Sequence, residues 1–413
     1  MKISPHTSRV YIDRDQICAN YRLLAEMLAA EGHTQSAAVS MSDRFGGRMS
    51  FAWPPMLAVV KADAYGHGHI QVSQALMEKE GVTVFASGSV SEAAELRVGL
   101  EETTGGQAQG KATLPLIVSL LGLIGPEDVA LCVEYGIVPV IHSFEQLPLL
   151  QALKRPLPVA IKCNSGMSRL GFGLDDMPRL LERLRDIPLV APALALSHLA
   201  CADSADGAEN IRHQASIFSR MLAALRGVWP NIAASLCNSA GILQAATATG
   251  IVGKHICRAG ISLYGCNPLY GTDFSSPAAN SLKPAMSVSS PIIAVRYLAP
   301  GEALGYGHTF VATRHMRVGI IAAGYADMLA RSLSGNAFFC AGDVRVPVLG
   351  RISMQMTALD LTEAPDLGVN DLVWLLGGPH EHAVTPEELA EVWGTITYEV
   401  FCLLGTNPRT YEL

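Results

Sequence analysis

Lys61 closes an apolar run at residues 56–60 and is followed by Ala62-Asp63-Ala64-Tyr65-Gly66-His67-Gly68. The chain contains only eight lysines, so an ammonium group at the end of a buried segment is an informative placement. Apolar surroundings lower the pKa of a lysine amine and leave it able to attack an aldehyde such as that of pyridoxal phosphate (PLP). A lysine at a strand end can also extend its head into water. The local pattern alone leaves both interpretations open.

Polar side chains also close or follow several later apolar runs. They are Arg169 after the fifth run, His198 at the end of the sixth, Asn238 and Ser239 at the end of the seventh, and Arg258 at the end of the eighth. Each has an ordinary alternative, such as a satisfied core histidine or a surface ion pair. In a parallel barrel the C-terminal ends of the strands meet at one rim. We therefore expect these side chains to gather beside Lys61 and Tyr65.

Two short segments have the composition of a phosphate-binding turn. They are Ser239-Ala240-Gly241 and Arg258-Ala259-Gly260-Ile261. Hydroxyl groups and backbone N–H groups at a tight turn or helix start bind phosphate, and barrels often place such a site after strands seven and eight. Because Ser-Ala-Gly is also an ordinary helix N-cap, the prediction depends on the position of these segments in the strand order.

Eight short apolar runs, separated by helix-like segments, must position these residues. Strands covered on both faces have continuous apolar sequences, so we predict an α/β fold with an N-terminal (β/α)8 TIM-like barrel over residues 10–282. An amphipathic helix is expected at 15–30, and loops at 31–50 and 101–112. The predicted strands are 57–61, 82–86, 114–119, 138–141, 159–163, 194–198, 234–238 and 254–258.

Beyond residue 282 the sequence changes to β-branched segments separated by turns. Strands are expected at 287–297, 316–323, 337–349 and 371–376, with one late helix at 386–393. This pattern predicts a C-terminal, mostly β domain over residues 283–413.

Composition excludes several classes of function. The chain of 413 residues is 49% hydrophobic with a formal charge of −7, so we expect a folded protein without a basic face for nucleic acid or an anionic membrane. The nine cysteines form no CxxC pair, which favours buried thiols in a reducing compartment, the cytoplasm, and predicts no metal site. No apolar stretch approaches the roughly 20 residues that span a bilayer, so no membrane partner is expected.

At this point the chain resembles the alanine racemases, PLP enzymes with an N-terminal barrel and a C-terminal β domain. The resemblance runs nearly from end to end, and the Lys61 motif with its Tyr-Gly-His-Gly tail is its most specific part. The other matching motifs are 165–172, 237–241, 258–265, Gly305-Tyr306-Gly307, Gly324-Tyr325-Ala326-Asp327 and Thr395-Ile396-Thr397-Tyr398-Glu399.

The resemblance implies interconversion of L-alanine and D-alanine by proton transfer between two bases on a PLP external aldimine. Lys61 would bind PLP and serve one face of the α-carbon, and Tyr306 would serve the other. His198 and Arg258 would support Tyr306 through a chain of hydrogen bonds, and Arg258 would also face the pyridine nitrogen and keep it unprotonated.

The resemblance also implies the remaining contacts and a head-to-tail homodimer. The substrate carboxylate would meet Arg169 and the backbone of Met354, and Lys162 matches a lysine that is often carbamylated in the family. The second domain would carry Tyr306, Tyr325 and Met354 to the barrel of the partner. The cofactor-binding residues implied are Lys61, Tyr65, Asn238, Ser239, Arg258, Gly260, Ile261 and Tyr398.

Three positions depart from the family pattern, namely Asn164, Ser353 and Gln355. Two bulky phenols, on Tyr325 and Tyr398, favour a small substrate such as alanine. A serine racemase or a racemase of broader range remains an alternative. A PLP-dependent decarboxylase lacks support, because its lysine motif and glycine-rich phosphate loop are missing, and a non-catalytic PLP carrier would have no use for a second domain with Tyr306.

Overall fold

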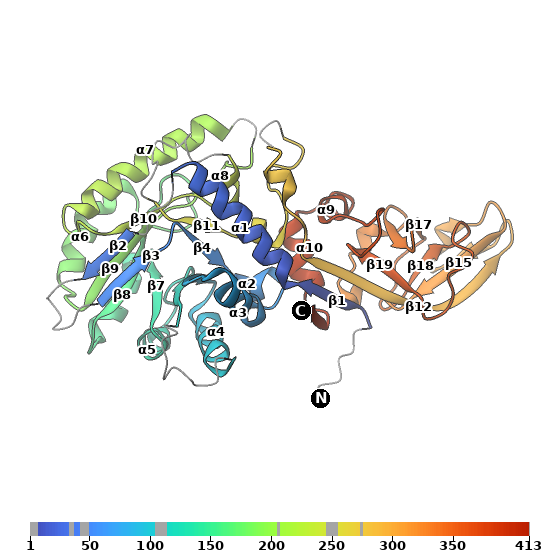
Figure 1. Ribbon diagram of the computed structural model, residues 1–413, viewed down its shortest axis with the longest axis horizontal. Helices are drawn as coiled ribbons and strands as arrows, with labels where there is room; N and C mark the ends of the chain where they lie inside the picture. Colours follow the sequence, from blue (N-terminus) through green and yellow to red (C-terminus); the bar gives the residue numbers. More distant parts are fainter. Residues whose placement is uncertain are drawn as a thin grey trace.

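The structure is a computed structural model that describes residues 7–32, 37–41, 49–103, 114–204, 207–244, 255–272 and 276–412. A barrel and a second, mostly β domain lie next to each other along the long axis of the molecule (Figure 1). Within the described ranges, no helix combines the length and apolar character that a membrane crossing requires.

Among the residues that the structure describes, eight parallel strands form the sheet of the barrel, in the order β10-β9-β8-β7-β6-β5-β4-β11. They are buried along nearly their whole length, as strands covered on both faces should be. Each predicted apolar run overlaps one of them, with bounds that differ by a few residues, so the barrel prediction is confirmed. Their bounds are β4 Met56–Val59, β5 Val84–Ser87, β6 Leu116–Ser119, β7 Ile137–Ile141, β8 Leu157–Lys162, β9 Val190–Leu196, β10 Ala233–Ser235 and β11 Cys257–Ala259.

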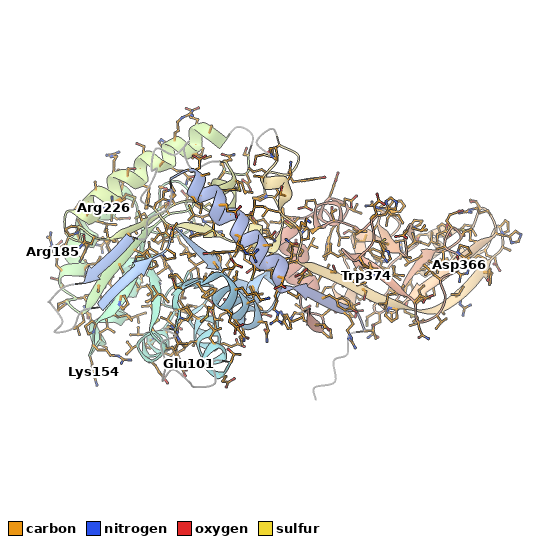
Figure 2. All side chains as sticks on the ribbon, viewed as in Figure 1. Glu101, Lys154, Arg185, Arg226, Asp366 and Trp374 are labelled. Atoms are coloured by element: carbon orange, nitrogen blue, oxygen red, sulfur yellow. The ribbon has the colours of Figure 1, made fainter. Side chains whose placement is uncertain are left out.

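Helices surround these strands (Figure 1). The helix predicted at 15–30 corresponds to α1, and α4 and α7 are among the helix-like segments expected between the strands. Charged side chains such as Glu101, Lys154 and Arg226 lie at the outer edge of this layer (Figure 2). The bounds are α1 Arg14–Ala30, α3 His69–Glu80, α4 Val90–Thr103, α5 Pro126–Tyr135, α6 Met177–Arg185, α7 Gly207–Arg226 and α8 Ser239–Leu243, with a 3-10 helix at Phe144–Ala152.

The loop predicted at 31–50 is partly wrong. Strands β2 (Ala37–Met41) and β3 (Met49–Trp53) pair antiparallel as a separate two-stranded sheet. The segment 49–53 alternates large apolar with small residues, a pattern of period two that favours a strand and that the general polarity of the region obscured. The loop predicted at 101–112 starts in the last turn of α4 and otherwise lies outside the described residues.

The second domain is built on the sheet β15-β18-β17-β16-β19-β12-β1-β20, which an additional pairing of β12 with β15 closes on itself. The long strand β12 runs through this domain (Figure 1), where Trp374 of β19 lies beside it (Figure 2). The prediction of a mostly β domain is confirmed. The bounds are β1 Arg9–Asp13, β12 Met286–Leu298, β13 Ala303–Leu304, β14 Phe310–Val311, β15 Met316–Ile321, β16 Phe338–Ala341, β17 Val344–Leu349, β18 Thr357–Asp360, β19 Leu372–Leu376, β20 Arg409–Glu412, α9 Pro386–Trp393 and α10 Thr397–Leu404.

The two domains are interleaved at the start of the chain. Strand β1 pairs antiparallel with β12 and parallel with β20, so the chain passes through the second sheet before it enters the barrel. The range 10–282 expected for the barrel therefore begins inside a strand of the second sheet. Helix α10 returns to the barrel, where its Tyr398 ring lies 5.9 Å from the ring of Tyr65.

Candidate active site

The C-terminal ends of the barrel strands surround a cavity of about 670 Å³. The cavity brings together the predicted residues of the barrel and one residue of α10. They are Lys61, Tyr65, Lys162, Arg169, His198, Asn238, Ser239, Arg258, Gly260, Ile261 and Tyr398. The expectation that polar strand ends meet at one rim is thus correct for this part of the chain.

Lys61 and Tyr65 stand at the two ends of a left-handed turn, α2 (Lys61–Tyr65). Residues 62–65 have φ values of 52–55°, a conformation that costs an L-residue about 1–2 kcal/mol. Neighbouring carboxylates stabilise this turn. Glu92 Oε1 accepts the N–H of Asp63 at 2.9 Å, and Asp63 Oδ1 accepts the backbone N–H of His69 at 2.8 Å. The strained turn allows Lys61 and Tyr65 to line the same cavity.

Arg258 is the central buried cation of the site. It donates from Nη1 to Ser235 Oγ at 2.6 Å, and from Nη2 to the Ser197 carbonyl at 2.7 Å and to His198 Nδ1 at 3.0 Å. Burial lowers the pKa of Arg258 to about 10, which leaves it charged at neutral pH. Burial, followed by the charge of Arg258, lowers the pKa of His198 to about 2. His198 is therefore neutral, and because Nδ1 accepts, its proton is on Nε2.

The two lysines of the cavity have lowered pKa values. Water reaches Lys61 from inside the cavity, but protein atoms surround much of it. This partial desolvation, with the charges of Arg169 and Arg258, lowers the pKa of Lys61. Desolvation and the same two guanidinium groups lower the pKa of Lys162 to about 7. The cavity therefore favours anionic ligands and makes the neutral, nucleophilic form of both amines more accessible.

The opposite wall has the groups that a phosphate requires. Ser239 Oγ accepts the N–H of Gly260 at 2.9 Å, which leaves its own hydroxyl proton available. A Cβ at residue 260 would lie 2.6 Å from Tyr65 Oη, so only glycine allows this close approach. Burial raises the pKa values of Tyr65 and Tyr398, and both phenols remain hydrogen-bond donors. Lysine amine, buried guanidinium and hydroxyl donors together fit PLP.

Three predicted residues lie apart from this cavity. Tyr306, Tyr325 and Met354 belong to the second domain, are not among the described lining residues, and are 68%, 43% and 57% exposed. Tyr325 and Met354 are neighbours, because the N–H of Tyr325 donates to the Ser353 carbonyl at 3.0 Å. One chain therefore does not bring them to its own Lys61.

Glu92, which was not among the predicted site residues, also lines the cavity. Besides Asp63, its carboxylate accepts from Ser87 Oγ at 2.8 Å and from the N–H of Gly88 at 2.6 Å. A signal was present, since Ser89 and Glu92 have the Ser-x-x-Glu spacing of a helix start directly after the second strand. The N–H of Glu92 donates to Ser89 Oγ at 3.0 Å.

Two family descriptions match this chain, "Alanine racemase, N-terminal domain" over residues 48–268 and "Alanine racemase, C-terminal domain" over residues 285–411. The chain belongs to the alanine racemase family. One relative, named alanine racemase, from Nitratidesulfovibrio vulgaris (strain Miyazaki F), is 44% identical over 362 residues, which cover 87% of this chain and 92% of the relative. The protein of the same name from strain DP4 is 42% identical and covers 100% of this chain and 99% of its own.

Solved structures of the alanine racemase family agree with the fold. The biosynthetic alanine racemase from Pseudomonas aeruginosa is 30% identical, with a TM-score of 0.75 over 99% of this chain and 100% of its own. The alanine racemase from Bartonella henselae is 27% identical, with a TM-score of 0.76 over the same shares, and its structure has covalently bound pyridoxal phosphate.

Proposed function

We propose that this protein interconverts L-alanine and D-alanine with PLP bound in the barrel cavity. The observation that carries the proposal is the meeting of Lys61, whose pKa is lowered, with the hydrogen-bonded pair of Arg258 and His198 in one cavity. When bound, PLP supplies the electron sink that makes the α-proton of an amino acid acidic. Membership of the alanine racemase family supports alanine as the substrate.

In this proposal each residue of the barrel has a distinct task. Lys61 holds the cofactor and then exchanges a proton with the α-carbon from one face. Tyr65, Tyr398, Asn238, Ser239 and the backbone of Gly260 and Ile261 bind the phosphate. Arg258 faces the pyridine nitrogen and, because a guanidinium retains its proton, keeps that nitrogen unprotonated. Arg169 binds the substrate carboxylate.

The second face of the α-carbon requires a second proton carrier. We assign it to Tyr306 of a partner chain in a head-to-tail homodimer, with residues 283–413 as the domain that reaches across. Two facts support this: Tyr306 is 68% exposed, and it does not line the cavity of its own chain. The Nε2 proton of neutral His198, backed by Arg258, is available to stabilise a phenolate there. Tyr325 and the backbone of Met354 accompany it toward the substrate.

The smaller tasks follow the same reasoning. Lys162, with a pKa of about 7, can be neutral at physiological pH and react with carbon dioxide, and the resulting carbamate would orient Arg169. The phenols of Tyr325 and Tyr398 restrict the substrate to a small side chain. All nine cysteines are free, which supports a cytoplasmic location.

Mixing two inactive variants tests the shared site. Lys61→Ala and Tyr306→Phe proteins are unfolded and refolded together at equal amounts with PLP, and racemisation of L-alanine is followed by circular dichroism. Half of the dimers are then mixed, and each mixed dimer has one complete site, so about a quarter of wild-type activity should return. If both residues act within one chain, no activity returns. Tyr297→Phe, at another exposed tyrosine, is the control and should remain active.

A further inference from the structure

Three side chains that can bind a metal meet in the wall of the barrel: Cys237, His255 and Cys257. Their ligand atoms all lie within 4.8 Å of one another, and Cys237 Sγ is 3.8 Å from His255 Nε2. All three residues are buried, and none of them lines the cavity described above. Within the part of the chain that the structure describes, no other three His, Cys, Asp or Glu side chains meet with this geometry.

The cluster spans the place where the barrel closes. Strands β10 and β11 stand at the two ends of the strand order, and in the described residues an isolated bridge between Ala234 and His255 joins them instead of a ladder. Cys237 follows β10, whereas His255 and Cys257 belong to the β11 side. A group bound by all three would therefore cross-link the two ends of the barrel sheet where backbone pairing is sparse.

We propose that Cys237, His255 and Cys257 bind a zinc ion that closes the barrel, with a water molecule in the fourth coordination position. Zinc binds thiolate sulfur at about 2.3 Å and imidazole nitrogen at about 2.0–2.1 Å, which separates neighbouring ligands by about 3.5–3.8 Å in a tetrahedron. The separation of Cys237 from His255 already has this size. Two thiolates and a neutral imidazole are also a soft donor set that selects zinc over magnesium or calcium.

Charge balance favours a divalent ion. Binding releases the two thiol protons to solvent, and two thiolates with one Zn²⁺ give a neutral complex, which a buried site tolerates far better than a net charge. A monovalent ion would leave one negative charge in the wall.

The site lies directly behind the residues of the cavity. Cys237 precedes Asn238 and Ser239 in the sequence, Cys257 precedes Arg258, and the N–H of Arg258 donates to the Cys237 carbonyl at 3.0 Å. A bound zinc would fix Ser239 and Arg258 relative to each other and slow the release of PLP. The slower release of PLP rests on the proposed function. Zinc binding itself does not, because it is measured as metal content.

Metal analysis of the holoenzyme tests the site. The protein is produced in zinc-supplemented medium, exchanged into metal-free buffer and analysed by plasma mass spectrometry. We expect about one zinc per chain, with a loss of zinc affinity of about 100-fold or more in Cys257→Ala and in His255→Gln. Cys18→Ala changes a buried cysteine on α1 that lies outside the cluster, and it should retain the zinc.

A second measurement keeps the test decisive if those variants fail to fold. Wild-type protein produced with cobalt in place of zinc should show visible cobalt bands of a thiolate site, at wavelengths where PLP does not absorb. Less than about 0.1 zinc per chain in the wild-type protein would overturn the inference. So would full zinc retention by Cys257→Ala, copper in place of zinc, or a Cys237–Cys257 disulfide in peptide maps of the purified protein. If zinc slowed the release of PLP from a protein that did not racemise alanine, the zinc site would be supported and the proposed function would be wrong.

Discussion

The rim of the barrel and the exposed tyrosines of the second domain are prepared for chemistry to different degrees. At the rim, Arg258 fixes the tautomer of His198 through a 3.0 Å hydrogen bond, and burial shifts the pKa of Lys61. In the second domain, Tyr306 is largely exposed. In the proposed mechanism, a single chain thus forms the cofactor site and one proton carrier, whereas the second carrier would need another chain to change its environment.

The largest effect that distinguishes the two regions is expected at Lys61. Lys61→Ala removes the amine to which we assign PLP binding and proton transfer on one face of the substrate, so alanine racemisation should fall by about 10⁴-fold or more. The absorbance of the PLP Schiff base should disappear with it. Racemisation is measured by circular dichroism and cofactor binding by the visible spectrum.

Lys154→Ala is the matched control, because Lys154 lies at the outer edge of the barrel (Figure 2). It should retain both the spectrum and the activity. A Lys61→Ala protein that still forms the Schiff base would show that another lysine, such as Lys162, binds the cofactor.

A smaller effect is expected from filling the phosphate wall. Gly260→Ala places a Cβ 2.6 Å from Tyr65 Oη, and such overpacking costs about 1–3 kcal/mol. The Kd for PLP should rise by about 10- to 100-fold, as measured by equilibrium dialysis of the apoenzyme. Gly368→Ala, where a Cβ meets no atom within 4 Å, should leave the Kd unchanged. An unchanged Kd in Gly260→Ala would show that residue 260 does not contribute to PLP binding.

The sequence predicted the barrel and its rim well, because strands buried on both faces have continuous apolar sequences and because polar residues at their ends face one side. It did not predict the left-handed turn at 62–65, where no glycine signals a positive φ. The place of β1 in the second sheet depends on pairing with strands about 280 and 400 residues later. The meeting of Cys237 with His255 and Cys257 likewise depends on the closure of the barrel. The spacing of the cysteines in the sequence does not reveal this contact, and the sequence therefore predicted no metal site.

An ion pair links the rim of the barrel to the second domain, and its removal should have a third, smaller effect on activity. Asp63 of the left-handed turn forms an ion pair with Arg409 of β20, and Arg409 Nη1 also donates to the Gly66 carbonyl at 3.1 Å. Asp63→Asn should loosen the turn that carries Lys61 and reduce kcat by about 5-fold, equivalent to about 1 kcal/mol. Arg22→Met breaks an ion pair with Glu80 that joins α1 to α3 and involves no residue lining the cavity, and it should change kcat by less than about 2-fold.

The pH dependence of the free energy of unfolding tests this ion pair independently of turnover. Partial burial opposes ionisation of Asp63, but hydrogen bonds from His69 and the charge of Arg409 outweigh it and lower its pKa. A carboxyl with a lowered folded pKa contributes stability that is present above its unfolded pKa of about 4 and is lost as the pH falls toward the folded value. Asp63→Asn should remove this contribution to the pH dependence of the free energy of unfolding, as measured by urea denaturation. An identical acid dependence in both proteins would contradict the assignment.

The smallest effect concerns Lys162, whose pKa of about 7 makes its amine increasingly neutral as the pH rises through that value. Carbon dioxide reacts with the neutral amine, so bicarbonate should raise wild-type activity by about 2- to 5-fold at pH 8, the size of one charge interaction with Arg169. Lys162→Met should lose this response, whereas Lys283→Met, at an exposed lysine, should retain it. An equal response of all three proteins would place the bicarbonate effect elsewhere, and Arg169 would then be oriented without a carbamate, by the barrel rim alone.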